Sequence, residues 1–188
     1  MNMEKEIIYR SVLTPPLANN RTIWGYAIVF NSQSEIMYDP KHGYFREIIL
    51  PTAIDNNLSI RSDVKALYEH DRERLLARSK NGKGTLKLSI DSHGLRYEFE
   101  APHTNLGNTV IELIKRGDLA GSSFAFVPEM KKIEKKGKIS IVTITKIKAL
   151  YDVSIVIDPA YPETETGLRN KGDKIDPLIN KIRIENNL

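Results

Sequence analysis

The four histidines are the first residues that could carry chemistry, because an imidazole can take up and release a proton near neutral pH. They stand at His42, His70, His93 and His103. Cysteine is absent from the 188 residues. This excludes a thiolate nucleophile, a cysteine-ligated zinc site and a disulfide framework. Any nucleophile must therefore be an oxygen or a lysine.

Metal and nucleotide motifs are also missing. No two histidines stand four residues apart, and there is no His-Glu-x-x-His motif. The glycine-containing segment 81–85 is too short for a phosphate-binding loop and is typical of a turn. We therefore expect no metal site and no cofactor.

His70 differs from the other histidines in its surroundings. It follows the apolar run 64–68 and precedes the charged run 71–74, which places an imidazole where a strand would leave the core. The other three lie in turn-like or strand-exit contexts that favour surface positions. Residue chemistry alone leaves both a functional and a surface role open for His70.

A candidate nucleophile lies in the segment Gly121-Ser-Ser-Phe-Ala125. Its Gly-x-Ser-x-Ala spacing superficially resembles the nucleophile elbow of α/β-hydrolases, which requires a strand before the serine, a helix after it and a later histidine. Here a helix is expected before the serine and a strand after it, and no histidine follows. That fold is excluded. If a serine is catalytic, its base must be an upstream histidine within about 2.6–3.2 Å of the hydroxyl.

The elements that must position these groups are mostly short strands rich in β-branched and aromatic residues. Residues 84–90 and 94–100 alternate around a tight link and predict a hairpin. Seven strands predict a barrel or sandwich. We expect them at residues 24–30, 66–68, 84–90, 94–100, 123–127, 139–145 and 149–157.

Two helices are predicted. Residues 105–116 have apolar positions at helical spacing, a capping residue at Asn108 or Thr109, basic residues in the last turn and Gly117 just beyond. Residues 50–58 predict a shorter helix with Pro51 in its first turn. No internal repeat is present.

The net charge of +4 is concentrated in one segment. Residues 129–148 carry seven lysines and two glutamates, and their pattern predicts two strands joined by a polar turn. Such a hairpin is usually a solvated surface. No aromatic residue stands between Met130 and Ala149, so nucleic acid is not an expected partner.

No apolar stretch approaches the roughly 20 residues that span a bilayer, and residues 1–10 lack a signal-peptide core. We therefore expect an intracellular protein without a membrane partner.

Four blocks in succession resemble the prohead maturation proteases of tailed bacteriophages, which share the herpesvirus assemblin type of serine protease fold. They lie at residues 25–53, 64–95, 114–126 and 150–161. The resemblance implies a mainly β fold with a few helices, a seven-stranded barrel or sandwich of the assemblin type. It also implies an N-terminal arm at 1–20, a protease domain at 21–166 and a tail at 167–188 that self-cleavage could remove.

The resemblance also implies the site. His70 is expected as general base and Ser123, which precedes Phe-Ala-Phe, as nucleophile. Ser122 is the alternative nucleophile, although its position is usually apolar in the family. Because adjacent strand residues point to opposite faces, only one of the two serines can meet His70. The herpesvirus relatives use a second histidine as third member, but none follows Ser123, so Asp152 is expected there.

The turn after the strand of Asp152 stands where that fold places its oxyanion loop, which implies the amides of Ala160 and Tyr161 as donors. The expected partners are the major capsid protein and its scaffold segment, inside the assembling prohead in the host bacterial cytoplasm. Whether the chain forms a homodimer, as the herpesvirus relatives do, stays open. The alternative is a non-enzymatic module that binds capsid or scaffold protein through the hairpin 131–148.

Overall fold

The computed structural model describes residues 7–12, 14–39, 43–55 and 57–157. Most of them lie in strands. The strands are β1 (Ile8–Val12), β2 (Leu17–Asn19), β3 (Thr22–Val29), β4 (Met37–Asp39), β5 (Gly43–Ile49), β6 (Asp63–Tyr68), β7 (Asp71–Lys80), β8 (Lys83–Gly84), β9 (Lys87–Ile90), β10 (Gly94–Glu100), β11 (Gly121–Lys136) and β12 (Ile139–Val156). The helical elements are the 3-10 turn η1 (Pro51–Ala53), α1 (Asn57–Arg61) and α2 (Asn105–Arg116).

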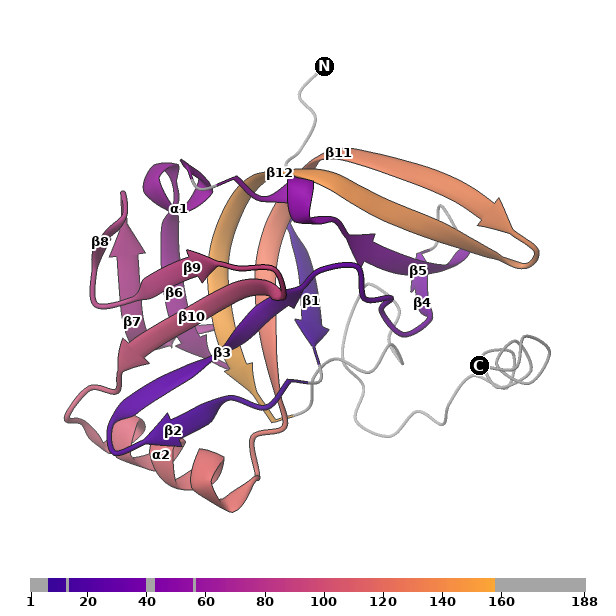
Figure 1. Cartoon of the computed structure of the whole chain (residues 1–188). Coiled ribbons are helices and arrows are strands. Elements are labelled where there is room, and N and C mark those ends of the chain that lie inside the picture. Colours follow the sequence, from indigo (N-terminus) through magenta and orange to yellow (C-terminus); the bar gives the residue numbers. More distant parts are fainter. Residues whose placement is uncertain (1–6, 13, 40–42, 56, 158–188) are drawn as a thin grey trace.

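These strands form two sheets (Figure 1). The larger sheet runs β1-β11-β12-β6-β7-β8, with β5 pairing parallel to the first half of β12 and β4 pairing with β5. The smaller sheet runs β2-β3-β10-β9. The second half of β12 pairs in parallel with β6 and antiparallel with β11. β12 therefore lies between β11, which bears the candidate nucleophile, and β6, which leads into the turn that bears the candidate base.

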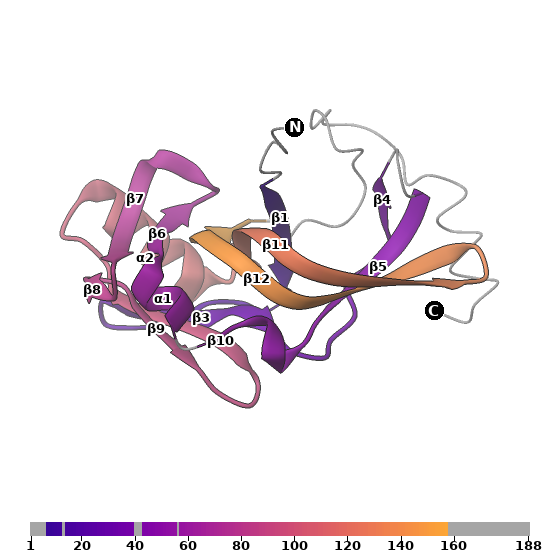
Figure 2. The same cartoon turned by 90° about the horizontal axis from the view of Figure 1, so that it is seen from above.

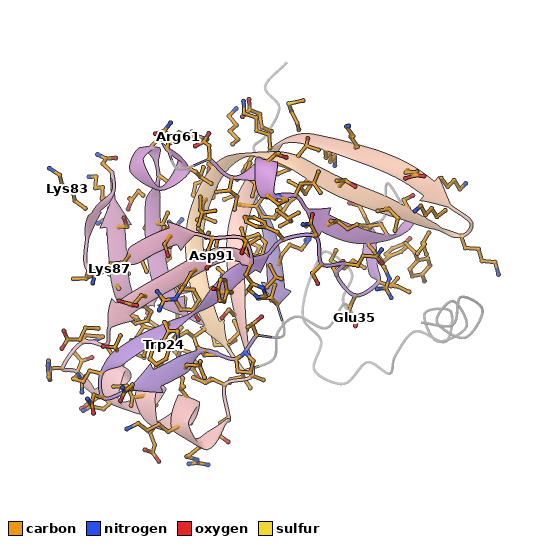
Figure 3. All side chains as sticks on the ribbon, in the orientation of Figure 1. Trp24, Glu35, Arg61, Lys83, Lys87 and Asp91 are labelled. Atoms are coloured by element: carbon orange, nitrogen blue, oxygen red, sulfur yellow. The ribbon has the colours of Figure 1, made fainter. Side chains whose placement is uncertain are left out.

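One hydrophobic core joins the two sheets. Inward-facing side chains of β3 and β10, such as Ile23, Tyr97 and Phe99, pack in the same cluster as Phe124 and Val153 of the larger sheet. Figure 3 shows this interior filled with side chains, whereas Lys83 and Lys87 point outward. The predicted mainly β class is confirmed. Neither described sheet closes on itself, however, so the barrel alternative is wrong, and the described residues form twelve strands where seven were predicted.

The helix α2 has the predicted range, Asn105–Arg116, but begins at a different cap. Thr104, not Asn108 or Thr109, is the N-cap, and its hydroxyl accepts a hydrogen bond from the Gly107 amide. Gly117 ends the helix at a φ of 80°, a left-handed conformation that glycine adopts without steric cost. Soon after the helix ends at Arg116, the serine-bearing strand β11 begins at Gly121.

Three other predicted boundaries are corrected. The predicted strands at 139–145 and 149–157 are one continuous strand, β12. The predicted helix at 50–58 is instead η1 followed by α1, because Ile54 after η1 is extended. The predicted strand at 84–90 is divided between β8 and β9.

The hairpin of β11 and β12 is the most extended feature of the molecule. Both views show it reaching beyond the body of the fold, away from α2, with β5 alongside (Figure 2). Its turn contains Gly137 at a φ of 61°. This confirms the predicted lysine-rich hairpin. Of the described helices, none has both the length and the apolar character that a membrane span requires.

Candidate active site

His70 occupies the tight turn between β6 and β7. Tyr68 pairs with Asp71, so Glu69 and His70 are the two central residues, with φ values of 58° and 55°. Left-handed backbone is unfavourable for both side chains, and Asn-Gly is the usual choice for such a turn. The Glu69 amide donates to the Ile155 carbonyl at 3.0 Å, and its carboxylate accepts from the Ile157 amide at 2.5 Å. These bonds hold the turn against the end of β12. The left-handed conformation of the turn brings the imidazole beside β11 and β12.

Ser123 lies on β11, and its side chain meets this imidazole. The distance between Ser123 Oγ and His70 Nε2 is 2.6 Å. The neighbouring Ser122 points the other way: its hydroxyl lies 2.8 Å from Tyr97 Oη and 3.3 Å from the Thr14 carbonyl oxygen. The structure thus brings Ser123, and not Ser122, to His70.

Tyr97 holds Ser122 in the core between the sheets. It is 1% exposed, and burial raises the pKa of its phenol, while the hydrogen bond with Ser122 acts in the opposite direction. Gly25 on β3 makes room for this ring, because a Cβ there would lie 2.7 Å from the phenol oxygen. Ser122 is therefore part of a buried neutral hydrogen-bond network on the face opposite His70.

Asp152 lies at the other nitrogen of His70. Its Oδ1 is 2.7 Å from His70 Nδ1, and the residue is 7% exposed. A carboxylate can only accept, so Nδ1 carries the hydrogen and Nε2 is left as the acceptor for the Ser123 hydroxyl. This tautomer is the one that a serine nucleophile requires.

Ser154 is a member of the site that the sequence analysis missed. Its hydroxyl donates to Asp152 Oδ1 at 2.8 Å and lies 3.1 Å from His70 Nδ1. It stands opposite Ser123 in the register of β11 and β12. Because strand residues two apart share a face, the spacing of 152 and 154 on a predicted strand is the signal that could have found it.

The N-terminal strand β1 also reaches the site. Ser123 Oγ donates to the Arg10 carbonyl oxygen at 2.8 Å, and the Tyr9 ring stands edge-on to the His70 ring at 4.9 Å. The Ser123 hydroxyl has one hydrogen, so it bonds either Nε2 or this carbonyl at a given moment. β1 falls within the predicted arm at 1–20, where no strand was expected.

The remaining candidate residues lie elsewhere. His93 is in the turn between β9 and β10 with its ring 4.5 Å from that of Tyr26, and His103 is exposed before α2. His42 and the proposed oxyanion donors Ala160 and Tyr161 lie outside the described residues. Across the described ranges, no group of three or more His, Asp or Glu side chains could hold a metal ion.

The arrangement Ser–His–Asp can perform nucleophilic catalysis. A serine hydroxyl is a weak nucleophile at neutral pH and needs an adjacent base, which itself needs a third group to orient it. The distances of 2.6 and 2.7 Å place all three groups within hydrogen-bond reach in that order. Acyl transfer through a covalent serine ester is the reaction class that fits.

Comparison with known proteins gives one family. The family model described as caudovirus prohead serine protease matches residues 6–176 of the 188. No curated protein and no solved structure matches the chain.

Proposed function

Because the chain belongs to the caudovirus prohead serine protease family, we propose that it is a serine endopeptidase that cleaves scaffold or capsid protein during prohead maturation. Ser123 is the nucleophile, His70 the general base and Asp152 the group that orients and stabilises the imidazole. The observation that carries this proposal is the position of His70 between Ser123 Oγ, at 2.6 Å, and Asp152 Oδ1, at 2.7 Å.

In the first half of the reaction, Ser123 Oγ attacks the carbonyl carbon of the substrate while its proton passes to His70 Nε2. The imidazolium is stabilised by Asp152, which keeps its negative charge. The C–N bond then breaks, and the leaving amine takes the proton from Nε2. The product of this half is an ester between Ser123 and the N-terminal part of the substrate.

In the second half, water replaces the amine. His70 Nε2 takes a proton from the water as its oxygen attacks the ester carbonyl, and returns a proton to Ser123 Oγ as the ester bond breaks. Both tetrahedral intermediates carry an oxyanion that needs amide donors. We propose that the amides of Ala160 and Tyr161 are these donors, because the family resemblance implies this position.

The natural substrates in this proposal are the major capsid protein and its scaffold segment, inside the assembling prohead in the host cytoplasm. We also propose a protease domain at 21–166 preceded by the arm at 1–20, and self-cleavage that removes the tail at 167–188. The intact mass of the protein, compared with that of Ser123→Ala, tests the last point. An unchanged 21.4 kDa species under assembly conditions would contradict it.

The proposal is tested by co-expressing the chain with its capsid protein. The native chain and Ser122→Ala should process the capsid protein, whereas Ser123→Ala and His70→Ala should not. Ser92→Ala, in an exposed turn, is the neutral control. Processing that survives Ser123→Ala would remove Ser123 as nucleophile, and processing lost only in Ser122→Ala would transfer the role to Ser122.

A further inference from the structure

The strand β1 covers the candidate nucleophile. It pairs antiparallel with β11 from Ile8↔Phe126 to Val12↔Ser122, which places Ser11 directly opposite Ser123. Ser123 is only 2% exposed, although a protease nucleophile must meet an extended polypeptide. β1 therefore takes the edge of β11 along which an extended substrate strand would reach Ser123.

The backbone of β1 already resembles a bound substrate. The Arg10 carbonyl oxygen accepts the hydrogen bond from Ser123 Oγ, so the Arg10–Ser11 peptide bond lies at the nucleophile. β1 is the end strand of its sheet, and proteins commonly bind extended peptides by adding a strand at such an edge. The edge of β11 is thus a site for an extended segment, and Arg10 has the position of the residue before the scissile bond.

The side chain of Arg10 contacts two groups on β5 that match its chemistry. Its Nε and Nη2 donate to the two carboxylate oxygens of Glu47, at 2.9 and 3.1 Å, and its guanidinium carbon is 5.7 Å from the centroid of the Phe45 ring. Glu47 is only 4% exposed. A buried carboxylate needs a cationic partner, and a planar guanidinium satisfies both of its oxygens at once.

We propose that β1 occupies the substrate site, and that Glu47 and Phe45 form the specificity pocket for the residue before the scissile bond, which is arginine or, less favourably, lysine. The inference rests on the proposed serine protease function and adds its substrate class. Arginine is preferred because lysine offers a point charge without the bidentate geometry.

Four quenched fluorogenic peptides test the specificity. One has the sequence of residues 7–16, Ile-Ile-Tyr-Arg-Ser-Val-Leu-Thr-Pro-Pro, and the others replace its arginine with lysine, glutamine or glutamate. For the full-length chain we expect kcat/KM to fall in the order arginine, lysine, glutamine, glutamate. The step from arginine to glutamine should be about tenfold or more, as expected for loss of a hydrogen-bonded charge pair.

Two variants separate a specificity pocket from a structural ion pair. Glu47→Gln should lower cleavage of the arginine peptide and remove the preference over glutamine. Arg10→Ala should raise cleavage of the same peptide, because β1 then competes less well for the site, and should keep the preference. An ion pair that only stabilises the fold would make both variants change activity in the same direction. Thermal melts of the two variants show whether both remain folded.

The outcomes distinguish this inference from the proposed function. Peptide cleavage that persists in Ser123→Ala would contradict the proposed function itself. Cleavage that depends on Ser123 but is equal for arginine and glutamine would overturn only the inference. Capsid processing that depends on Ser123, with none of the four peptides cleaved by the native chain or by Arg10→Ala, would also overturn only the inference.

Discussion

The two ring nitrogens of His70 have different roles, and its hydrogen-bond partners determine which nitrogen accepts a hydrogen bond. Asp152 and Ser154 lie at Nδ1, at 2.7 and 3.1 Å, while Ser123 lies at Nε2. A hydrogen on Nδ1 is the condition for proton transfer from Ser123 to Nε2. In the proposed mechanism, the residues on the Nδ1 side therefore act through His70 without contacting the substrate.

Asp152→Asn and Ser154→Ala should differ strongly in their effect on kcat. An asparagine amide can donate to Nδ1 and so favours the tautomer with its hydrogen on Nε2, which should lower kcat on the order of 10²–10⁴-fold. Ser154→Ala removes a hydrogen bond to the Asp152 carboxylate but leaves Asp152 to hold the tautomer, so a smaller loss, about tenfold, is expected. Steady-state assays with one peptide measure both. Similar losses in the two variants would contradict this division of roles.

At the scale of elements, the turn between β6 and β7 combines function with strain. His70 has a φ of 55°, in the left-handed region that every residue except glycine adopts at a cost. Backbone strain of this kind persists where surrounding contacts enforce it, here the hydrogen bonds that Glu69 makes with Ile155 of β12 and with Ile157 just beyond it. The turn is thus stabilised by β12 rather than by its own sequence.

Replacing His70 with glycine or alanine separates the effect of losing the imidazole from the effect of the left-handed backbone. Both variants lose the imidazole and its hydrogen bonds and should be inactive. His70→Gly should be more stable than His70→Ala by about 0.5–1 kcal/mol, because only glycine adopts the left-handed backbone without cost. Urea denaturation of the two proteins gives the difference. A more stable alanine variant would mean that the turn relaxes out of the left-handed region.

An ion pair across β6 and β7 should make stability depend on pH. The hydrogen bonds from Arg78, and then from Lys65, hold the pKa of Asp63 well below its ordinary value of 3.8, against the opposing effect of desolvation. A carboxyl whose folded-state pKa is depressed adds stability above its unfolded value and loses it as the pH falls through the folded one. Because Asp63 is partly exposed, the contribution should be about 1 kcal/mol or less.

We therefore expect urea midpoints of the native chain and Asp63→Asn to differ at pH 7 and to converge as the pH falls below 3.8. Asp118→Asn is the matched control, since that carboxylate pairs with Arg116 outside the sheet. A difference between the native chain and Asp63→Asn that stays constant into acid would contradict an ionic origin.

Elements with local signals could be predicted from the sequence. In the β9–β10 hairpin, apolar and polar residues alternate around a tight link. In α2, apolar residues at helical spacing are followed by basic residues in the last turn and by Gly117. β7 was missed because its first half is charged and exposed. β1 was missed because the charged Arg10 stands in the middle of a short strand, and the sequence does not show that Glu47 pairs with it. His70, Ser123 and Asp152 were found through the family resemblance. The geometric contrast between Ser122 and Ser123 required the register of β11, whereas Ser154 could have been found from its position two residues after Asp152 on one strand.

At the scale of the whole molecule, the lysine-rich end of the β11–β12 hairpin projects away from the body of the fold that contains the candidate site. The hairpin that carries the lysines projects from the body, and its β11 residues from Glu129 to Lys136 are exposed. The non-enzymatic alternative assigns the whole function to this hairpin and does not account for the arrangement around His70. We propose instead that the hairpin positions acidic partners for an enzyme.

Charge reversal tests the hairpin without touching the site. Lys135→Glu combined with Lys136→Glu should leave peptide cleavage unchanged and reduce processing of co-expressed capsid protein. The matched control, Lys83→Glu with Lys115→Glu, makes the same charge change at exposed positions outside the hairpin. The effect should weaken as salt rises, since exposed charges are screened. Equal processing by both double variants would remove the docking role.

The most direct measurement of the central claim is the site of covalent attachment by a fluorophosphonate, which reacts with activated serines. Peptide mapping by mass spectrometry, on the native chain and on Arg10→Ala, should find the adduct on Ser123, and His70→Ala should abolish it in both. Ser122→Ala should keep it. An adduct on Ser122, or none on Ser123 in either protein, would contradict the account.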